Sequence, residues 1–240
     1  MEDWKTYIFS DTPFPNKAVK VFENQFENNK IYHSFCNALH NVSRRYSSKI
    51  EYHYNRLSTD KIKEEYLSRV RNEIEAVPLL PIQGFKDADI YSTPAKDPEL
   101  LFKSSGTSGM KQSRHLVADA ELYRKSILNG FGHFYNPDNA VILAYTPGYS
   151  QNPNSSLIWM LNELIRQDTS GLSRFLPLDQ PLHAADVQEI ADSGKQLFLF
   201  GAAFGLLDLA EISDISLPSN SIVIETGGMK TYKREMGRME

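Results

Sequence analysis

The segment SSGTSGMKQSRH, from Ser104 to His115, is the stretch around which the rest of the chain can be interpreted. It follows the apolar run LLF at 100–102, and its glycines permit backbone conformations and close approaches that side chains prevent. Hydroxyl and backbone N–H groups in such a segment can donate to phosphate oxygens, while Lys111 or Arg114 supplies positive charge. The segment therefore predicts a phosphate-binding loop, although an ordinary turn has the same composition. The predicted phosphate-binding residues are Ser104, Ser105, Gly106, Thr107, Ser108 and Gly109.

The spacing of the two glycines excludes a Walker A motif. That motif requires G-x-x-x-x-G-K-[ST] leading directly into a helix, and Gly106 and Gly109 are too close together for it. The chain also continues through RHLV at 114–117 before any helical pattern begins. We therefore predict that the segment is the loop of a hairpin.

Composition sets broad limits on the fold and the function. The chain has 240 residues and 41% hydrophobic residues, enough for one large domain or for a domain with a helical preface. Its net charge of −4 includes no long basic run, which argues against a dedicated nucleic-acid surface. No apolar segment approaches the roughly 20 residues that cross a bilayer, and the N-terminus is too polar for a secretory signal. We expect a cytoplasmic protein without a membrane span.

The single cysteine, Cys36, excludes an internal disulfide and a cysteine-rich zinc site, as suits a reducing compartment. Beside Phe35 on a predicted helix, Cys36 is expected to be a buried packing residue. The alternative is a thioester-forming nucleophile, which needs a lowered pKa and an exposed position. The six histidines show no metal-binding spacing, and among them His115 is the one near the predicted loop.

The first 92 residues form a predicted helical region. Apolar residues recur at helical spacing over 17–29 and 31–40, which predicts packing helices. A third helix is predicted to begin at Ser58 or Thr59 and to end at Val77, because Pro78 stops it. The following VPLLPIQGF, broken by prolines and a glycine, predicts an irregular docking segment that joins the helices to the rest.

Residues 93–240 form a predicted α/β region. Short apolar runs at 140–145, 196–200 and 221–225 predict strands, and helical patterns lie between them. Asp119 and Ser155 or Ser156 are predicted N-caps of two of these helices. Strands that alternate with helices imply a largely parallel sheet with flanking helices.

Ligands of such sheets bind beyond the carboxyl ends of the strands. The loops expected there are 146–154, 201–204 and 226–230, and all contain glycine. Glycine backbone after a strand can accommodate an adenine or ribose, and the alternative is a plain turn. Small residues at a strand end can open a channel for an acyl chain, and the alternative is close packing between helix and sheet. The predicted substrate-binding residues are Tyr149, Gly201, Ala202 and Ala203, and those next to the nucleotide are Thr226, Gly227 and Gly228.

The sequence SSGTSG followed by a lysine resembles the phosphate-binding motif of the adenylate-forming superfamily. This superfamily contains acyl- and aryl-CoA ligases, luciferases and peptide-synthetase adenylation domains. The usual form is close to SSGTTGxPKG, so this chain lacks the proline and has Gln112 in place of a glycine. Four blocks in order, LFKSSGTSG, SRHLVADAELYRKSI, LAYTPGYSQNPNSSLIWM and IVIETGGMKTYKREMGR, look like the LuxE-type acyl-protein synthetase of bacterial bioluminescence. The resemblance extends from about Leu100 to the C-terminus.

This resemblance implies an α/β fold like the N-terminal domain of adenylate-forming enzymes. It also implies ATP and Mg²⁺, a fatty acid or other carboxylic acid as substrate, and a partner acyl-reductase or acyl-transferase. The acid is converted to an acyl-adenylate and transferred to a protein thiol. Carried over to this sequence, residues 104–109 hold the triphosphate, residues 226–228 face adenine, and Lys111 is the catalytic cation, with Arg114 as the alternative.

The chain departs from the family at its C-terminal side. The superfamily's threonine-glutamate motif, ribose-binding aspartate and mobile C-terminal domain would all follow Glu240. Family members also keep their acyl-accepting cysteine near the C-terminus, whereas the one cysteine of this sequence, Cys36, lies near the opposite end. We therefore expect a fragment of a longer protein, with the C-terminal part of the fold missing. Two other functions stay open, which are an acyl- or aryl-CoA ligase of the phenylacetate-CoA ligase type and a non-catalytic nucleotide-binding module.

Overall fold

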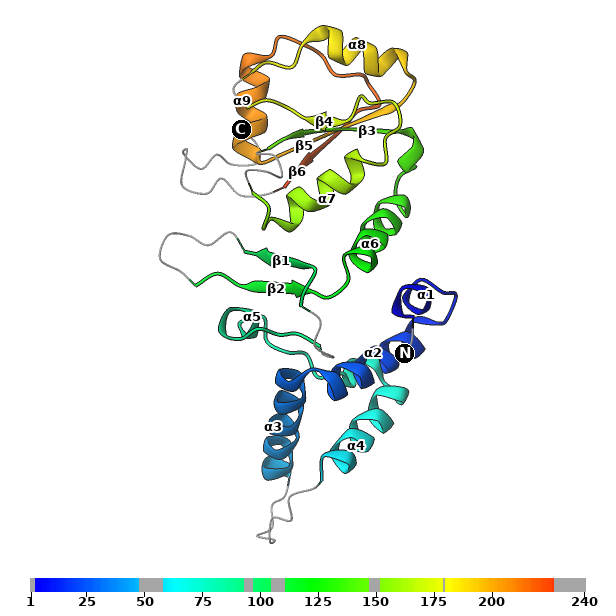
Figure 1. Ribbon diagram of the computed structural model, residues 1–240, viewed down its shortest axis with the longest axis vertical. Helices are drawn as coiled ribbons and strands as arrows, with labels where there is room; N and C mark the ends of the chain where they lie inside the picture. Colours follow the sequence, from blue (N-terminus) through cyan, green and yellow to red (C-terminus); the bar gives the residue numbers. More distant parts are fainter. Residues whose placement is uncertain are drawn as a thin grey trace. The chain divides into compact units, whose positions relative to one another are not determined.

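The computed structural model describes residues 3–47, 58–92, 97–104, 111–146, 152–178 and 180–226. The chain divides into two compact units, Met1–Tyr123 and Arg124–Glu240. The first unit contains the predicted helical region and a two-stranded hairpin, and the second contains a four-stranded sheet with helices (Figure 1).

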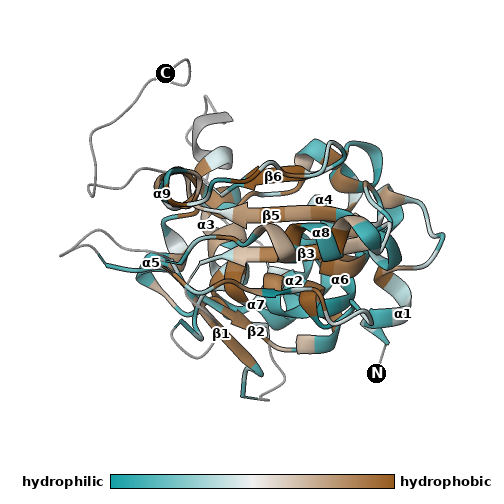
Figure 2. Ribbon diagram, turned by 90° about the horizontal axis from the view of Figure 1, so that it is seen from above, coloured by the Kyte–Doolittle hydropathy of each residue, from teal (hydrophilic) through white to brown (hydrophobic). Residues whose placement is uncertain are grey.

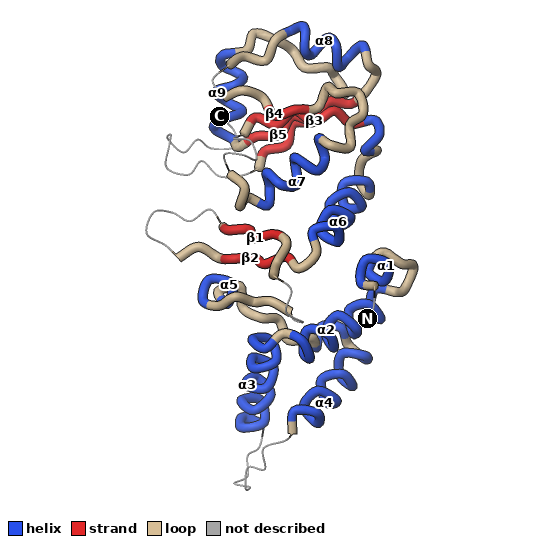
Figure 3. Tube along the Cα trace, viewed as in Figure 1, coloured by secondary structure: helices blue, strands red, loops and turns tan. Residues whose placement is uncertain are grey.

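The first unit is built mainly from helices (Figure 3). Its core is formed where one apolar stripe of each long helix meets the others, and it includes Phe22, Phe26, Cys36 and Leu67. These helices confirm the packing helices predicted over 17–29 and 31–40. The helical elements are α1 (Trp4–Ile8), α2 (Phe14–Asn28), α3 (Lys30–Ser47), α4 (Thr59–Asn72), the 3₁₀ turn η1 (Ile74–Ala76) and α5 (Gly84–Asp87).

The helix predicted to reach residue 77 is shorter than expected. Helix α4 ends at Asn72, because Glu73 adopts an extended conformation and its N–H makes the last bond, to the carbonyl of Arg69. The 3₁₀ turn η1 then leads to Pro78, whose carbonyl accepts a hydrogen bond of 2.7 Å from the Tyr32 hydroxyl. That contact attaches the proline-containing segment to α3, as expected of a docking segment.

The predicted hairpin is confirmed. Strands β1 (Leu100–Lys103) and β2 (Arg114–Val117) are antiparallel, and Lys103 lies opposite Arg114. Phe102 is buried and packs against the ring of Tyr123, with ring centroids 5.4 Å apart. After the hairpin, Asp119 caps the next helix as predicted, since its Oδ1 accepts a 2.9 Å bond from the N–H of Leu122.

The second unit is α/β, as predicted, and its sheet, predicted to be largely parallel, is parallel throughout the described strands. Its strand order is β4-β3-β5-β6. Three of these strands match the runs predicted to be strands, whereas β4 and α8 were not predicted. The elements are α6 (Ala120–Gly132), whose first turn belongs to the first unit, η2 (Pro137–Asn139), β3 (Ala140–Tyr145), α7 (Ser156–Ile165), β4 (Arg174–Phe175), α8 (Ala184–Asp192), β5 (Gln196–Gly201), α9 (Ala203–Ile212) and β6 (Ile222–Glu225).

Helices cover both faces of this sheet. On one face, Val141 and Leu197 pack with residues of α8 and α9; on the other, Ile142 and Phe198 pack with residues of α6 and α7. Burial on both faces explains why β3 and β5 are continuous apolar runs, drawn brown in Figure 2. The fold class established here is an α/β unit with a parallel sheet and flanking helices.

Candidate functional site

The predicted phosphate-binding loop starts and ends at a pair of serines. The N–H of Ser104 donates to the carbonyl of Ser113 over 3.1 Å, and the N–H of Ser113 donates to Oγ of Ser104 over 2.9 Å. This pair extends the β1–β2 ladder by one step and fixes the base of the loop. Because Oγ of Ser104 accepts in this contact, its hydrogen is still available to donate to a ligand.

The two candidate cations lie on the returning arm of the hairpin, and each faces an aspartate. Nζ of Lys111 lies 3.6 Å from Oδ1 of Asp87, at the end of α5, and Nη1 of Arg114 lies 3.1 Å from Oδ1 of Asp89. All four side chains are at least about half exposed. Exposed pairs of this kind contribute at most about 1 kcal/mol, so an anionic ligand can displace the aspartates.

A histidine next to these cations was not assigned a role from the sequence. His115 stacks on the ring of Phe85, with centroids 4.9 Å apart and planes 24° apart. Its Nε2 lies 3.0 Å from Oγ of Ser113, the residue that closes the loop. The stacking and the hydrogen bond fix the imidazole at the base of the loop. The signal in the sequence was its position directly after Arg114, at the end of the segment 104–115.

The second group of predicted residues lies at the carboxyl edge of the parallel sheet. Gly201 is the last residue of β5 and is in register with Tyr145 of β3 and Glu225 of β6. The N–H and the hydroxyl of Thr226 both donate to the carbonyl of Gly201, over 2.9 Å and 3.2 Å. The structure therefore brings two predicted ligand-binding residues, Gly201 and Thr226, into contact.

The small residues after β5 have a packing explanation. A Cβ added to Gly201 would lie 2.8 Å from the side chain of Leu206 in α9 and 3.3 Å from the carbonyl oxygen of Tyr145. Ala202 is the N-cap of α9, and Ala203 is its first residue. Close helix–sheet packing, the alternative to an acyl channel, thus accounts for the glycine at 201.

Several predicted site residues lie outside the residues that the structure describes. They are Ser105, Gly106, Thr107, Ser108, Gly109, Tyr149, Gly227 and Gly228. Of the predicted residues that are described, Ser104 and Lys111 belong to the first unit, and Gly201, Ala202, Ala203 and Thr226 belong to the second.

Cys36 is a packing residue, as expected, and not an exposed nucleophile. Its side chain is 0% exposed in the core of the first unit, and burial raises the pKa of its thiol to about 11. Its backbone carbonyl accepts a 3.1 Å bond from the hydroxyl of Tyr66. A thiol with this pKa and no access to solvent is a poor nucleophile near neutral pH.

The described residues offer a partial fit to ATP and no protein site for a metal ion. The hydroxyl of Ser104 and the side chains of Lys111 and Arg114 are donors and cations of the kinds that bind phosphate. Within the described ranges, no group of three or more His, Cys, Asp or Glu side chains could hold a metal ion. Magnesium bound to nucleotides takes many of its ligands from phosphates and water.

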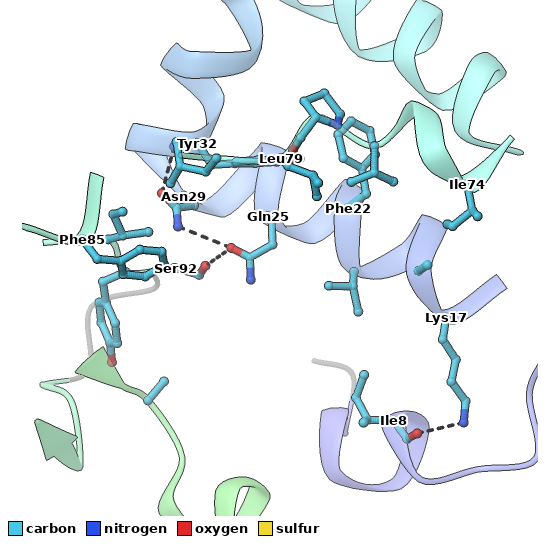
Figure 4. Close-up of a pocket in the computed structure, with 18 of the residues that line it drawn as sticks. Ile8, Lys17, Phe22, Gln25, Asn29, Tyr32, Ile74, Leu79, Phe85 and Ser92 are labelled. Atoms are coloured by element: carbon cyan, nitrogen blue, oxygen red, sulfur yellow. Dashed lines mark hydrogen bonds between the residues drawn. The ribbon is translucent and has the colours of Figure 1, made fainter. Parts of the chain in front are cut away.

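A large cavity lies in the first unit, and the sequence analysis did not predict it. Its volume is about 1140 Å³. Its lining comes from helices α1, α2, α3 and α5, from η1 and the segment after it, from residues 90–92 and from β2 (Figure 4). The signal was present in α2, where Phe14, Lys17, Val21 and Gln25 recur at helical spacing. The packing face predicted over 17–29 was the stripe of Val19, Phe22 and Phe26. The neighbouring stripe was not considered, and periodicity does not reveal that it borders a cavity.

A scan against protein-family models, a search of curated proteins and a search of solved structures each found no match. The similarity to adenylate-forming enzymes is therefore still a prediction from the sequence. Among the described helices, none combines the length and apolar character needed to cross a membrane.

Proposed function

We propose that the protein uses ATP to activate a carboxylic acid, with a fatty acid as the preferred substrate, and that the acyl group passes from an acyl-adenylate to a protein thiol. The observation that carries this proposal is the hairpin. Ser104 and Ser113 close the SSGTSG segment at its base, and Lys111 and Arg114 lie on the arm that follows. This places a hydroxyl and two displaceable cations at one loop, which suits a polyphosphate.

The chemistry gives each of these groups a role. A carboxylate oxygen forms a bond to the α-phosphorus, the bond between the α-phosphorus and the bridging oxygen breaks, and pyrophosphate leaves with the electron pair. Negative charge grows on the leaving oxygen, so Lys111 stabilises it, with Arg114 beside it on the same arm. The Ser104 hydroxyl donates to a phosphate oxygen and helps to hold the triphosphate in position.

Magnesium supplies charge neutralisation on the phosphates when it is bound with ATP. The described residues of the hairpin supply the cations and the hydroxyl donor that contact the phosphates in this proposal.

ATP–pyrophosphate exchange in the presence of a long-chain fatty acid tests the proposal. Exchange is measured in this chain and in a version that continues past Glu240. In whichever of the two is active, we expect a loss of about 10²-fold in Lys111→Ala, the size of effect seen when one charge-stabilising donor is removed. Lys61→Ala is the matched control, since Lys61 is an exposed lysine of α4 in the same unit. Absence of exchange in both versions with every carboxylic acid would overturn the proposal. Loss in Arg114→Ala with full activity in Lys111→Ala would reassign the catalytic cation.

A second candidate is an acyl- or aryl-CoA ligase. Burial of Cys36 argues against it as the acyl acceptor, so the acceptor is a different thiol, of a protein or of coenzyme A. The acyl-protein synthetase and the CoA ligase can be distinguished by trapping the activated acid as a hydroxamate. The experiment compares fatty acids with aromatic acids. Preference for fatty acids supports the acyl-protein synthetase, whereas preference for aromatic acids and release of acyl-CoA on addition of coenzyme A support the ligase.

A further inference from the structure

The cavity of the first unit is separate from every residue assigned to the proposed reaction. Its volume of about 1140 Å³ exceeds the roughly 300–1,000 Å³ of most small-molecule sites. Its lining is mostly apolar and includes Ala18, Val21, Phe22, Leu80 and Ile90. A site of this size and composition suits a ligand with a long apolar body.

Two polar residues of the lining belong to α2, namely Lys17 and Gln25. They are eight residues apart, which is about 12 Å along a helix axis. Ala18, Val21 and Phe22 line the cavity between them. The cavity therefore offers an apolar path bordered by two polar positions (Figure 4).

These two positions differ in what they offer a ligand. Oε1 of Gln25 already accepts bonds from Ser92 Oγ over 2.6 Å and Asn29 Nδ2 over 3.3 Å. The ammonium of Lys17 donates to the carbonyls of Ile8, at 2.8 Å, and Ser10, at 2.5 Å. An ammonium has three N–H donors, and these two bonds use two of them. Within the described ranges, the third N–H of Lys17 contacts no carboxylate. A charged group with a donor to spare is thus present at the Lys17 position.

Apolar side chains of the lining are also exposed to solvent. Phe14 is 72% exposed and Leu79 is 83% exposed, and both line the cavity. An aliphatic chain that lies against them would remove apolar surface from water, which favours binding. An aliphatic ligand would cover these exposed apolar side chains, whereas a compact polar ligand would not.

We propose that this cavity binds a long-chain aliphatic carboxylic acid, with the carboxylate on the ammonium of Lys17 and the chain along Ala18, Val21 and Phe22. Binding requires no nucleotide, because none of the predicted nucleotide-binding residues lines the cavity. The site is therefore an acyl-binding site of the helical unit, distinct from the carboxyl edge of the sheet.

Calorimetric titration of the wild-type chain with saturated fatty acids of increasing length, without ATP, tests the proposal. We expect the affinity to rise about fourfold per added methylene until the chain fills the cavity, which corresponds to about 0.8 kcal/mol per buried CH₂. Absence of binding, or an affinity that does not change with chain length, would overturn it. Because no nucleotide is present, a failure of the adenylation proposal leaves this result unaffected.

The role of Lys17 is tested by comparing each fatty acid with the alcohol of the same chain length. Wild type is expected to prefer the acid about tenfold, and Lys17→Met to lose that preference while it keeps the affinity for the alcohol. Lys30→Met, at an exposed lysine that begins α3 outside the lining, should keep the preference. An unchanged preference in Lys17→Met would remove Lys17 from the site, and loss of alcohol binding in that variant would mean that Lys17 shapes the cavity and does not anchor a carboxylate.

Filling the cavity provides an independent test. Val21→Trp should lower the affinity for the acid and the alcohol at least tenfold, whereas Val42→Trp, at an exposed position of α3 that is not in the lining, should have no effect. Circular dichroism checks that both variants are folded, and Ala18→Leu replaces Val21→Trp if the larger residue prevents folding. Full binding by a folded, cavity-filled variant would contradict the proposed site.

Discussion

At the scale of single residues, Asp168 is the most heavily hydrogen-bonded carboxylate of the second unit among the described residues. Its side chain is 1% exposed and accepts bonds from Nζ of Lys195 at 2.9 Å and from the N–H and hydroxyl groups of Ser170 and Ser173. The Ser173 hydroxyl also accepts a 2.9 Å bond from the N–H of Ile142 in β3. Asp168 therefore connects the segment after α7 to the central strand and to the residue before β5.

Replacement of Asp168 by Asn should destabilise the second unit by about 3 kcal/mol, because Lys195 loses its partner and the new amide group faces hydrogen-bond donors. Burial alone would raise the pKa of Asp168, but Lys195 and the two serines hold it well below its usual range. The folded pKa is thus lower than the unfolded value of about 3.9. The stabilisation is present in full above that pH and is lost as the pH falls toward the folded value.

Urea unfolding at neutral pH and near pH 3 measures this effect. We expect the free energy of unfolding of the second unit to fall with acidification in the wild type and to fall less in Asp168→Asn. Asp214→Asn is the control, since Asp214 is exposed. An equal acid sensitivity in wild type and Asp168→Asn would show that other carboxylates cause the pH dependence.

Helix caps could be predicted from the sequence, whereas the ion pair between Asp168 and Lys195 could not. The caps Asp119 and Ser155 each bond an N–H three residues ahead, at 2.9 Å and 3.3 Å, so a short window contains all the information. Asp168 and Lys195 are 27 residues apart, and the fold alone brings them together. The aspartate partners of Lys111 and Arg114 were missed for the same reason, since each lies some two dozen residues earlier in the chain.

At the scale of elements, the contact between β5 and α9 depends on the absence of a side chain at Gly201. Gly201→Ala should cost about 1–3 kcal/mol, because its Cβ would lie 2.8 Å from Leu206, which is too close without a shift of α9. Gly205→Ala is the matched control in α9. Its Cβ would lie 3.4 Å from Tyr145, an ordinary contact, and replacing a helical glycine by alanine contributes about 0.5–1 kcal/mol of stability.

Denaturant unfolding of the two variants checks this prediction, with opposite signs of change expected. If Gly201→Ala were as stable as wild type, the close packing of Leu206 would not explain the glycine. A role in ligand binding would then be the better account of it.

Elements differed in how well the sequence revealed them. Strand β3 was predicted with the same limits, because both of its faces are buried and its residues form one apolar run. Strand β4 has two residues, which is too short for any periodic pattern, and its pairing with Leu143 and Ala144 arises from the tertiary fold. The cavity beside α2 was missed because periodicity identifies an apolar face without showing what it contacts.

At the scale of the whole molecule, each unit has its own hydrophobic core. The core cluster around Phe22 and Phe26 contains residues of the first unit, and the two clusters on the faces of the sheet contain residues of the second. A chain with separate cores can unfold in more than one step, and a single free energy of unfolding then does not describe it.

The two tryptophans of the sequence allow this to be measured, since Trp4 belongs to the first unit and Trp159, which is buried in α7, belongs to the second. In Trp159→Phe the fluorescence reports on the first unit, and in Trp4→Phe it reports on the second. We expect the two variants to give urea transitions at different midpoints. Adding Gly201→Ala should shift the transition seen through Trp159 to lower urea and leave that seen through Trp4 in place, because Leu206 packs in a core cluster of the second unit. Equal shifts of both signals would mean that the two cores unfold as one cooperative unit.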